Sequence, residues 1–497
     1  NPGGAWIFRR DPFSPHSDPL IAVWLFSVME TVFPQQKKLR KEHAPNICGK
    51  GESNMNQTFM KEKKILPLVL SMSLPMVISM AVNSLYNIVD SYFVAQLSED
   101  AMTALSLVYP VHEFITSVAV ASARRHQRGH RPVLGAGDEK RASQAASQGL
   151  LLNILHGVIL AVGCILLMPL FLSLFTERTD LAGMAVSYAN IAFAFSPIIT
   201  AGITYEKIFQ AVGQMKLTMI SMLCGCVANI VLDPLMIFGI GPFPRMEIEG
   251  AALATGIGQT LTLIIYLVFY SRSSWQVQIR RKYAGVDRKM AIRLYGVGIP
   301  ATLNMALPSF LISALNGILV TFSESYVLVL GVYYKLQTFI YLSANGIVQG
   351  IRPLIGYNLG AGERGRVRKI YQTALILSAA IMAVGTALCW LMPAQLFGLF
   401  TANETTISMG VTALHLISLG FIVSAVSVTS SGALEGMGKG TPSLVISLLR
   451  YVVVIIPAAF FMSMRLGAAG VWGAFPVAEI VTAVISWLIW RRYLEKR

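Results

Sequence analysis

Long apolar segments joined by short polar connections make up the chain from Ile65 onward. Most are about 20 residues or longer, the length that a helix needs to cross the hydrocarbon core of a bilayer. The connections leave no room for a large soluble domain. We therefore predict an all-α polytopic membrane protein with twelve transmembrane helices. The apolar segments are 65–92, 101–123, 147–172, 184–205, 217–240, 250–270, 291–320, 326–351, 371–393, 407–430, 442–464 and 468–490.

The second half of the chain repeats the first. Pro75 has a counterpart in Pro300, 225 residues further on, and Leu134-Gly135-Ala136-Gly137 recurs at the same spacing as Leu359-Gly360-Ala361-Gly362. An even number of helices per repeat gives both copies the same orientation, related by an axis along the membrane normal. This pattern predicts two six-helix bundles of the kind that rock about a central cleft in alternating-access transporters.

The expected domains follow from this repeat and from a change of composition near residue 60. The first 60 residues are polar, with one apolar stretch too short to span a bilayer, and we interpret them as a disordered or non-native extension. The remaining divisions are an N-terminal lobe at 61–271, a basic cytoplasmic linker at 272–290, a C-terminal lobe at 291–490 and a basic cytoplasmic tail at 491–497.

Composition and charge agree with a membrane protein. Only 13% of the residues are charged and the mean hydropathy is +0.60, whereas soluble proteins carry about 25% charged residues. The net charge of +15 could indicate nucleic-acid binding, but the basic residues gather on alternate short connections. The other set of connections holds only Arg178, Arg245 and Arg465. By the positive-inside rule we place both termini in the cytoplasm of a cell with this protein in its plasma membrane, and expect no nucleic-acid partner.

The end of the second segment departs from the repeat. Residues 123–132 contain four arginines, whereas residues 348–357 contain one. Either the span ends near Ala123 and a basic segment enters the cytoplasm, or this stretch reflects a local change of reading frame, since its composition changes while the 225-residue spacing holds on both sides.

Acidic residues inside apolar spans are costly and therefore candidates for function. Asn83, Asn87 and Asp90 recur at i, i+4 and i+7, so they share one helix face, which we expect to point into the bundle. Asn229 and Asp233 are also four residues apart, and Pro234 follows at once. A helix broken there would free backbone carbonyls to join the carboxylate in binding a cation.

The repeat makes these two acids distinctive. At the 225-residue spacing Asp90 corresponds to Leu315, and aligning Pro234 with Pro457 places Ile456 opposite Asp233. We therefore expect a coupling ion to bind in the N-terminal bundle. Lys335, Gln337 and Glu479 are further polar candidates for the lining of a substrate cavity, whereas Glu206 and Glu435, beside cytoplasmic turns, are expected to be solvated.

Signals of an enzyme are missing from the sequence. Gly135-x-Gly137 follows no strand, no Walker lysine pattern occurs, and Cys224-x-Cys226 lacks a second ligand pair at zinc spacing. We expect no enzymatic activity, no cofactor, and no metal other than a coupling Na⁺ at Asp90 and Asp233.

Residues 60–497 resemble the multidrug and toxic compound extrusion (MATE) family. The likeness rests on the two six-helix halves, the paired Leu-Gly-Ala-Gly turns, Asp90, Asn229-x-x-x-Asp233-Pro234, and Gly250-Ala251-Ala252-x-Ala254-Thr255. It implies a cation-binding network of Asp90, Asn229, Asp233 and Thr255. It also implies a monomeric secondary active exporter that exchanges organic, in particular cationic, compounds for Na⁺ or H⁺. A flippase for a lipid-linked saccharide and a channel or receptor remain as alternatives.

Overall fold

The structure is a computed structural model that describes residues 59–135, 139–174, 176–272, 275, 277–280, 283, 303, 307–400 and 403–495, without the side chains of 99, 121–135, 139, 141 and 324. All regular secondary structure in these ranges is helical. The predicted extension before residue 59, nearly all of the linker and the start of the seventh segment lie outside the described residues.

The N-terminal lobe consists of eight helices and carries five of the six predicted spans as single helices or helix pairs with clear bounds. The sixth, α5, continues past Ala123 to Gly135. The helices are α3 (Phe59–Glu62), α4 (Ile65–Leu97), α5 (Glu99–Gly135), α6 (Glu139–Ser173), α7 (Thr179–Ala194), α8 (Ser196–Ala211), α9 (Met215–Phe238) and α10 (Glu247–Arg272).

The C-terminal lobe begins, in the described part of the chain, with an apolar helix at Leu307–Leu319, which falls within the predicted seventh span. The elements that follow are α12 (Glu324–Gly360), α13 (Arg364–Leu391), α14 (Pro393–Gly398), α15 (Glu404–Ser418), α16 (Phe421–Gly436), α17 (Gly440–Leu448), the π-helix η2 (Leu449–Val453), α18 (Ile455–Leu466) and α19 (Ala468–Glu495). Over the described residues, nine helices are long and apolar enough to span a membrane, and two bent helix pairs raise this number to eleven.

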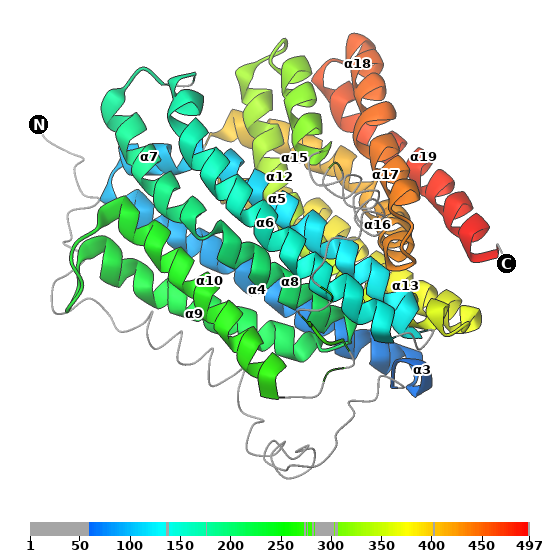
Figure 1. The fold of residues 1–497 in the computed structure, drawn as a ribbon. Coiled ribbons are helices and arrows are strands. Elements are labelled where there is room, and N and C mark those ends of the chain that lie inside the picture. Colours follow the sequence, from blue (N-terminus) through cyan, green and yellow to red (C-terminus); the bar gives the residue numbers. More distant parts are fainter. Residues whose placement is uncertain are drawn as a thin grey trace, which may run out of the picture. The chain divides into compact units, whose positions relative to one another are not determined.

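The helix bounds follow the sequence repeat. The first residues of α5, α6, α7, α8 and α9 precede those of α12, α13, α15, α16 and α17 by 225 residues in every case. The turns after α8 and α16 each contain a left-handed glycine, Gly213 and Gly438, at the same spacing. The same local sequence signals therefore fold the same way in both halves (Figure 1).

One span in each lobe is bent. The axes of α7 and α8 differ by 44° and those of α15 and α16 by 54°. The first bend falls at Phe195, two residues before Pro197, whose ring cannot continue the hydrogen bonding of α7. The second falls at Leu419 and Gly420, of which Gly420 is the repeat counterpart of Phe195.

The helix α9 is continuous through Pro234, contrary to the break that we considered at this position. Proline removes one helical hydrogen bond, so the backbone group it leaves without a helical partner is the carbonyl four residues earlier, at Ile230. Around the corresponding Pro457, the backbone instead widens into η2. A π-turn adds a residue to the helix and is often associated with function.

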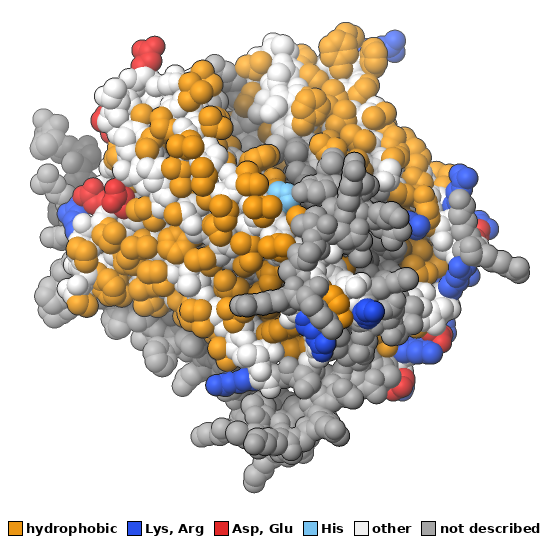
Figure 2. All heavy atoms as spheres, viewed as in Figure 1, with side chains coloured by type: hydrophobic (Ala, Val, Ile, Leu, Met, Phe, Trp, Pro, Cys, Tyr) orange, Lys and Arg blue, Asp and Glu red, His pale blue; other side chains and the backbone are white. Residues whose placement is uncertain are grey.

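The two lobes meet mainly where α4 crosses α12. A Cβ at Gly346 would lie 2.8 Å from Val77 Cα, and a Cβ at Gly350 would lie 2.6 Å from Ser73 Cα, so these glycines let the two backbones touch. An apolar cluster that includes Met72, Met76 and residues of α12 continues this seam. Figure 2 shows hydrophobic side chains over most of one face, with charged side chains toward its margins, as expected for embedding in a bilayer.

Candidate functional site

The polar residues predicted on α9 and α10 form one hydrogen-bonded group. Asn229 Nδ2 donates to Asp233 Oδ1 at 3.0 Å and to Thr255 Oγ1 at 3.2 Å. The helices can approach this closely because two glycines lie between them: a Cβ at Gly258 would be 2.8 Å from the carbonyl oxygen of Gly225. The sequence thus builds the group from an i, i+4 pair on α9 and a glycine contact that brings Thr255 within reach.

Three oxygen atoms of this region are buried and accept no hydrogen bond from any described residue. They are Asp90 Oδ1, Asn229 Oδ1 and Asp233 Oδ2. A buried polar atom without a partner costs about 1–3 kcal/mol, so such atoms usually indicate a missing proton, ion or water. The two carboxyl groups also lie within range of mutual electrostatic repulsion, which a bound cation or proton would relieve.

A cavity of about 410 Å³ opens beside this group. Asn83, Asn87 and Asp90 all line it, so the polar stripe on α4 points inward as predicted. Asn229 and Thr255 line it as well, whereas Asp233 is fully buried behind them. The cavity therefore gives one route of access to the carboxyl groups of this lobe.

The rest of the cavity lining is acidic and aromatic. Glu113 and Glu206 contribute carboxyl groups, and the Lys207 ammonium lies 2.6 Å from Glu206 Oε1. Four tyrosines add ring faces and hydroxyls: Tyr86, Tyr109, Tyr188 and Tyr266. Except for Gln349 of α12, the lining residues come from the N-terminal lobe.

One end of the cavity is closed at the seam between the lobes. Gln210 Nε2 donates to Met76 Sδ at 3.4 Å, and Gln349 Nε2 donates to Met80 Sδ at 3.1 Å. Beyond these contacts, α3 fastens the two lobes together, since Asn358 Nδ2 and Arg366 Nη2 both donate to the carbonyl oxygen of Met60. The closed end is the one with the basic connections, which is the predicted cytoplasmic side.

The other predicted cavity residues lie elsewhere. Lys335 is exposed, with its ammonium 5.8 Å from the centre of the Phe400 ring. Gln337 donates to the Tyr333 hydroxyl at 2.8 Å, and Glu479 forms an ion pair with Arg450. The structure does not bring these three residues to the cavity described above.

Two acidic residues that we expected to be solvated are largely buried instead. Glu435 is only 4% exposed, and its carboxylate lies 2.8 Å from Arg352 Nη2. Glu206 is paired with Lys207 in the cavity wall. The expectation of solvation was wrong because helix packing covers these helix ends, and a basic partner supplied by the fold makes their burial tolerable.

Sequence reasoning also missed two functional candidates. Glu113 lies within the second span, and Arg450 is the only charged residue between Lys439 and Arg465. Both could have been found by the rule that identified Asp90, namely that a charged side chain inside a span indicates function or a specific partner.

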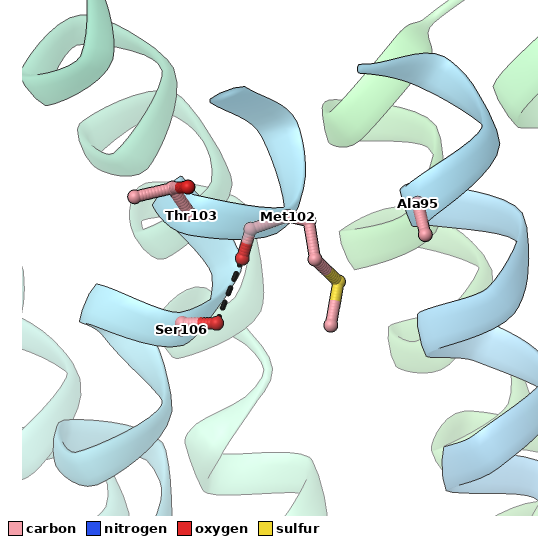
Figure 3. A pocket seen from close by; sticks show the side chains of 4 residues that line it. All are labelled: Ala95, Met102, Thr103 and Ser106. Carbon is pink, nitrogen blue, oxygen red and sulfur yellow. Dashed lines mark hydrogen bonds between the residues drawn. The ribbon is translucent and has the colours of Figure 1, made fainter. Parts of the chain in front are cut away.

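A second, shallower pocket lies between the ends of α4 and α5 (Figure 3). Ala95 lines it from α4, and Met102, Thr103 and Ser106 line it from α5. The Ser106 hydroxyl donates to the carbonyl oxygen of Met102, which leaves a mostly apolar wall. Nothing in this pocket resembles the acceptor group beside Asp90.

Comparison with known proteins identifies relatives over both lobes. The MatE family model matches residues 75–235 and 300–461, two stretches that begin 225 residues apart. The Multidrug export protein MepA of Staphylococcus aureus is 24% identical over 436 residues, which cover 87% of this chain and 94% of MepA. MepA of Staphylococcus saprophyticus is 24% identical over 432 residues, with the same coverage.

Solved structures share the fold. A multidrug resistance MATE family transporter of the MOP superfamily, in an outward-facing conformation, matches with a TM-score of 0.82 at 23% identity over 90% of this chain and all of that one. A MOP superfamily transporter from Pyrococcus furiosus, described as having a binding pocket of reverse polarity, gives the same values. The likeness extends over twelve helices in two bundles related by an internal repeat.

Proposed function

Since the chain belongs to the MatE family of multidrug exporters, we propose that it exports organic cations in exchange for Na⁺ or H⁺ entering from outside the cell. Asp90, Asn229, Asp233 and Thr255 bind the coupling ion. The substrate occupies the cavity beside them. Occupation of one site by the entering ion favours release of the outgoing compound from the other.

The observation that carries this proposal is the set of three buried oxygens without partners, on Asp90, Asn229 and Asp233. Carboxylate and amide oxygens are the ligands that hard cations prefer, and a carboxylate can equally accept a proton. Charged groups inside a membrane protein persist when they are paired or when they serve an ion pathway. Because this group has two carboxyls and no described basic partner, it is suited to a positive charge from solution.

The cavity supports an organic cation as the substrate. Its carboxyl groups outnumber its one lining ammonium, which is already paired with Glu206. Tyrosine rings attract cations through their faces and accommodate flat apolar groups. A compound with a positive charge and an aromatic body would therefore find complementary contacts at Glu113, Tyr109 and Tyr188.

The closed seam supports transport by alternating access. The contacts of Gly346 and Gly350 with α4 block the cavity on the side of the basic connections, so the opposite state must separate these helices. The cavity and the acceptor group are complete within one chain, which supports a monomer as the working unit. We retain both termini on the cytoplasmic side from the placement of the basic residues.

The alternatives are less well supported. A flippase for a lipid-linked saccharide would need cationic side chains for an anionic headgroup, whereas the described lining is mainly acidic. A channel or receptor would have no need for a buried acceptor group in range of a closed seam.

The decisive experiment measures efflux from proteoliposomes with Na⁺ and pH gradients imposed separately. The Asp90→Asn, Asp233→Asn double variant should lose ion-driven efflux while remaining inserted and monodisperse. Asp180→Asn, which removes an exposed carboxylate at the far end of α7, is the matched control and should retain efflux. Undiminished ion-driven efflux from the double variant would refute the proposal.

A further inference from the structure

The C-terminal lobe contains a membrane-embedded ion pair that the proposed transport mechanism does not use. Arg450 Nε donates to Glu479 Oε1 at 2.7 Å, and Arg450 Nη2 lies 2.6 Å from the same oxygen. The two side chains are only 10% and 12% exposed. Two opposite charges in such surroundings stabilise each other, and removal of either leaves the other uncompensated.

Neighbouring side chains complete the surroundings of both charges. Arg450 Nη2 also donates to the Tyr341 hydroxyl at 3.3 Å and Nη1 to the Tyr451 hydroxyl at 3.4 Å, and the guanidinium lies over both rings. The Ser427 hydroxyl donates to Glu479 Oε2 at 3.4 Å. Both oxygens of Glu479 therefore have partners, unlike the carboxyl oxygens in the N-terminal lobe.

This pair lies at the same helix crossing as the acceptor group of the other lobe. Arg450 is in η2, between α17 and α18, which correspond to α9, and Glu479 is in α19, which corresponds to α10. At both crossings a glycine near the start of the second helix touches the backbone of the first. A Cβ at Gly250 would lie 2.7 Å from the carbonyl carbon of Met236, and one at Gly470 would lie 2.4 Å from that of Met462.

These glycine contacts give the depth of each group. Thr255 follows Gly250 by five residues and Glu479 follows Gly470 by nine, so Glu479 lies about one helical turn deeper. The bend residues confirm the correspondence: the Phe195 ring lies against Gly256 beside Thr255, and its counterpart Gly420 lies against Glu479. A Cβ at Gly420 would be 3.2 Å from Glu479 Cγ, so a large side chain at this bend would displace Glu479.

We propose that Arg450 is a tethered cation that holds, in the C-terminal lobe, the place that the mobile coupling ion holds in the N-terminal lobe. The inference rests on the proposed function, because it assumes that an ion binds at Asp90 and Asp233. Its consequence is specific to the reaction. Glu479 is permanently neutralised by a covalently attached charge, so ion coupling is confined to the N-terminal lobe, and Arg450 limits the number of ions exchanged in each cycle.

The first experiment removes the tethered charge and tests whether a mobile one replaces it. Dicyclohexylcarbodiimide reacts with protonated carboxyls in apolar surroundings, and mass spectrometry of peptides locates the product. In the full-length protein in liposomes at neutral pH, Glu479 should be unreactive. In Arg450→Met it should take up a proton and react at least tenfold more. Arg450→Lys, which keeps a positive charge, should remain unreactive. Equal labelling of Glu479 in the unsubstituted protein and in Arg450→Met would overturn the proposal.

A second measurement does not depend on the folding of an Arg450 variant. Equilibrium binding of ²²Na⁺, or proton uptake, is compared between the unsubstituted protein and the Asp90→Asn, Asp233→Asn double variant. We expect binding to disappear. Binding that remains in the double variant and is lost when Glu479→Gln is added would overturn the tethered-cation proposal alone. Binding unchanged by all of these substitutions would instead refute the proposed function.

Discussion

The glycine contact between α4 and α12 allows a quantitative prediction about the closed seam. A Cβ at Gly350 would lie 2.5 Å from Ser73 Oγ and 2.6 Å from Ser73 Cα. Ordinary contacts begin at 3.4 Å, so Gly350→Ala would force the two backbones apart by about 0.8 Å. Overpacking of this kind costs about 1–3 kcal/mol. If only the closed state bears this cost, its population relative to the state open to the cytoplasm falls by about five- to 140-fold.

The cavity provides its own reporter for this shift. Cys226 lines the cavity, so with the other four cysteines replaced its labelling by a membrane-impermeant maleimide reports access from the side on which the reagent is added. Labelling from the cytoplasmic side should rise in Gly350→Ala. Gly331→Ala on the same helix is the control, since a Cβ there would meet nothing within 4 Å. If Gly350→Ala is labelled at the rate of the control, the seam does not gate the cavity.

Three further predictions concern individual contacts. Asn229→Leu keeps the side-chain volume but removes an acceptor and two hydrogen bonds, so ion affinity should fall at least tenfold, as about 1.5–3 kcal/mol is expected for a hydrogen bond to a charged group; Val231→Leu on the outer face of α9 should leave it unchanged. Glu113→Gln should weaken binding of organic cations, measured by fluorescence or calorimetry, while binding of uncharged analogues stays within twofold. Arg366→Gln removes the hydrogen bonds to Met60 and Lys63 that hold α3, so trypsin should cleave faster at Lys61–Lys64, and an unchanged rate would show that α3 is held by other contacts.

Much of the fold follows from the sequence because a membrane span needs a long apolar segment, and such segments are visible without tertiary information. The repeat made the helix starts predictable to the residue in the described part of the chain. The bends at Phe195 and Gly420 were not predicted, because apolar composition continues across them while the backbone changes direction. Hydropathy reports the solvent preference of a segment and contains no information on its straightness.

The candidate site was predictable to the extent that its chemistry is local. Asn229 and Asp233 are one turn apart, so a helix brings them together whatever surrounds it. The pairing of Glu479 with Arg450 joins residues 29 positions apart, and that of Glu435 with Arg352 joins residues 83 positions apart. Such pairs depend on which helices become neighbours, so a single sequence identifies each charge as costly without identifying its partner.

The two lobes show that a repeated backbone does not impose a repeated chemistry. Asp90 corresponds to Leu315, which is fully buried in the apolar core of the C-terminal lobe, and Ile456, opposite Asp233, packs against the same core. At the helix crossing itself, one lobe leaves acidic oxygens without partners and the other supplies an arginine. Two identical ion sites would make both lobes respond to the same ion. With one exchangeable and one fixed charge, the N-terminal lobe alone changes its electrostatic energy as ions come and go, while the C-terminal lobe can serve as the constant surface against which it moves.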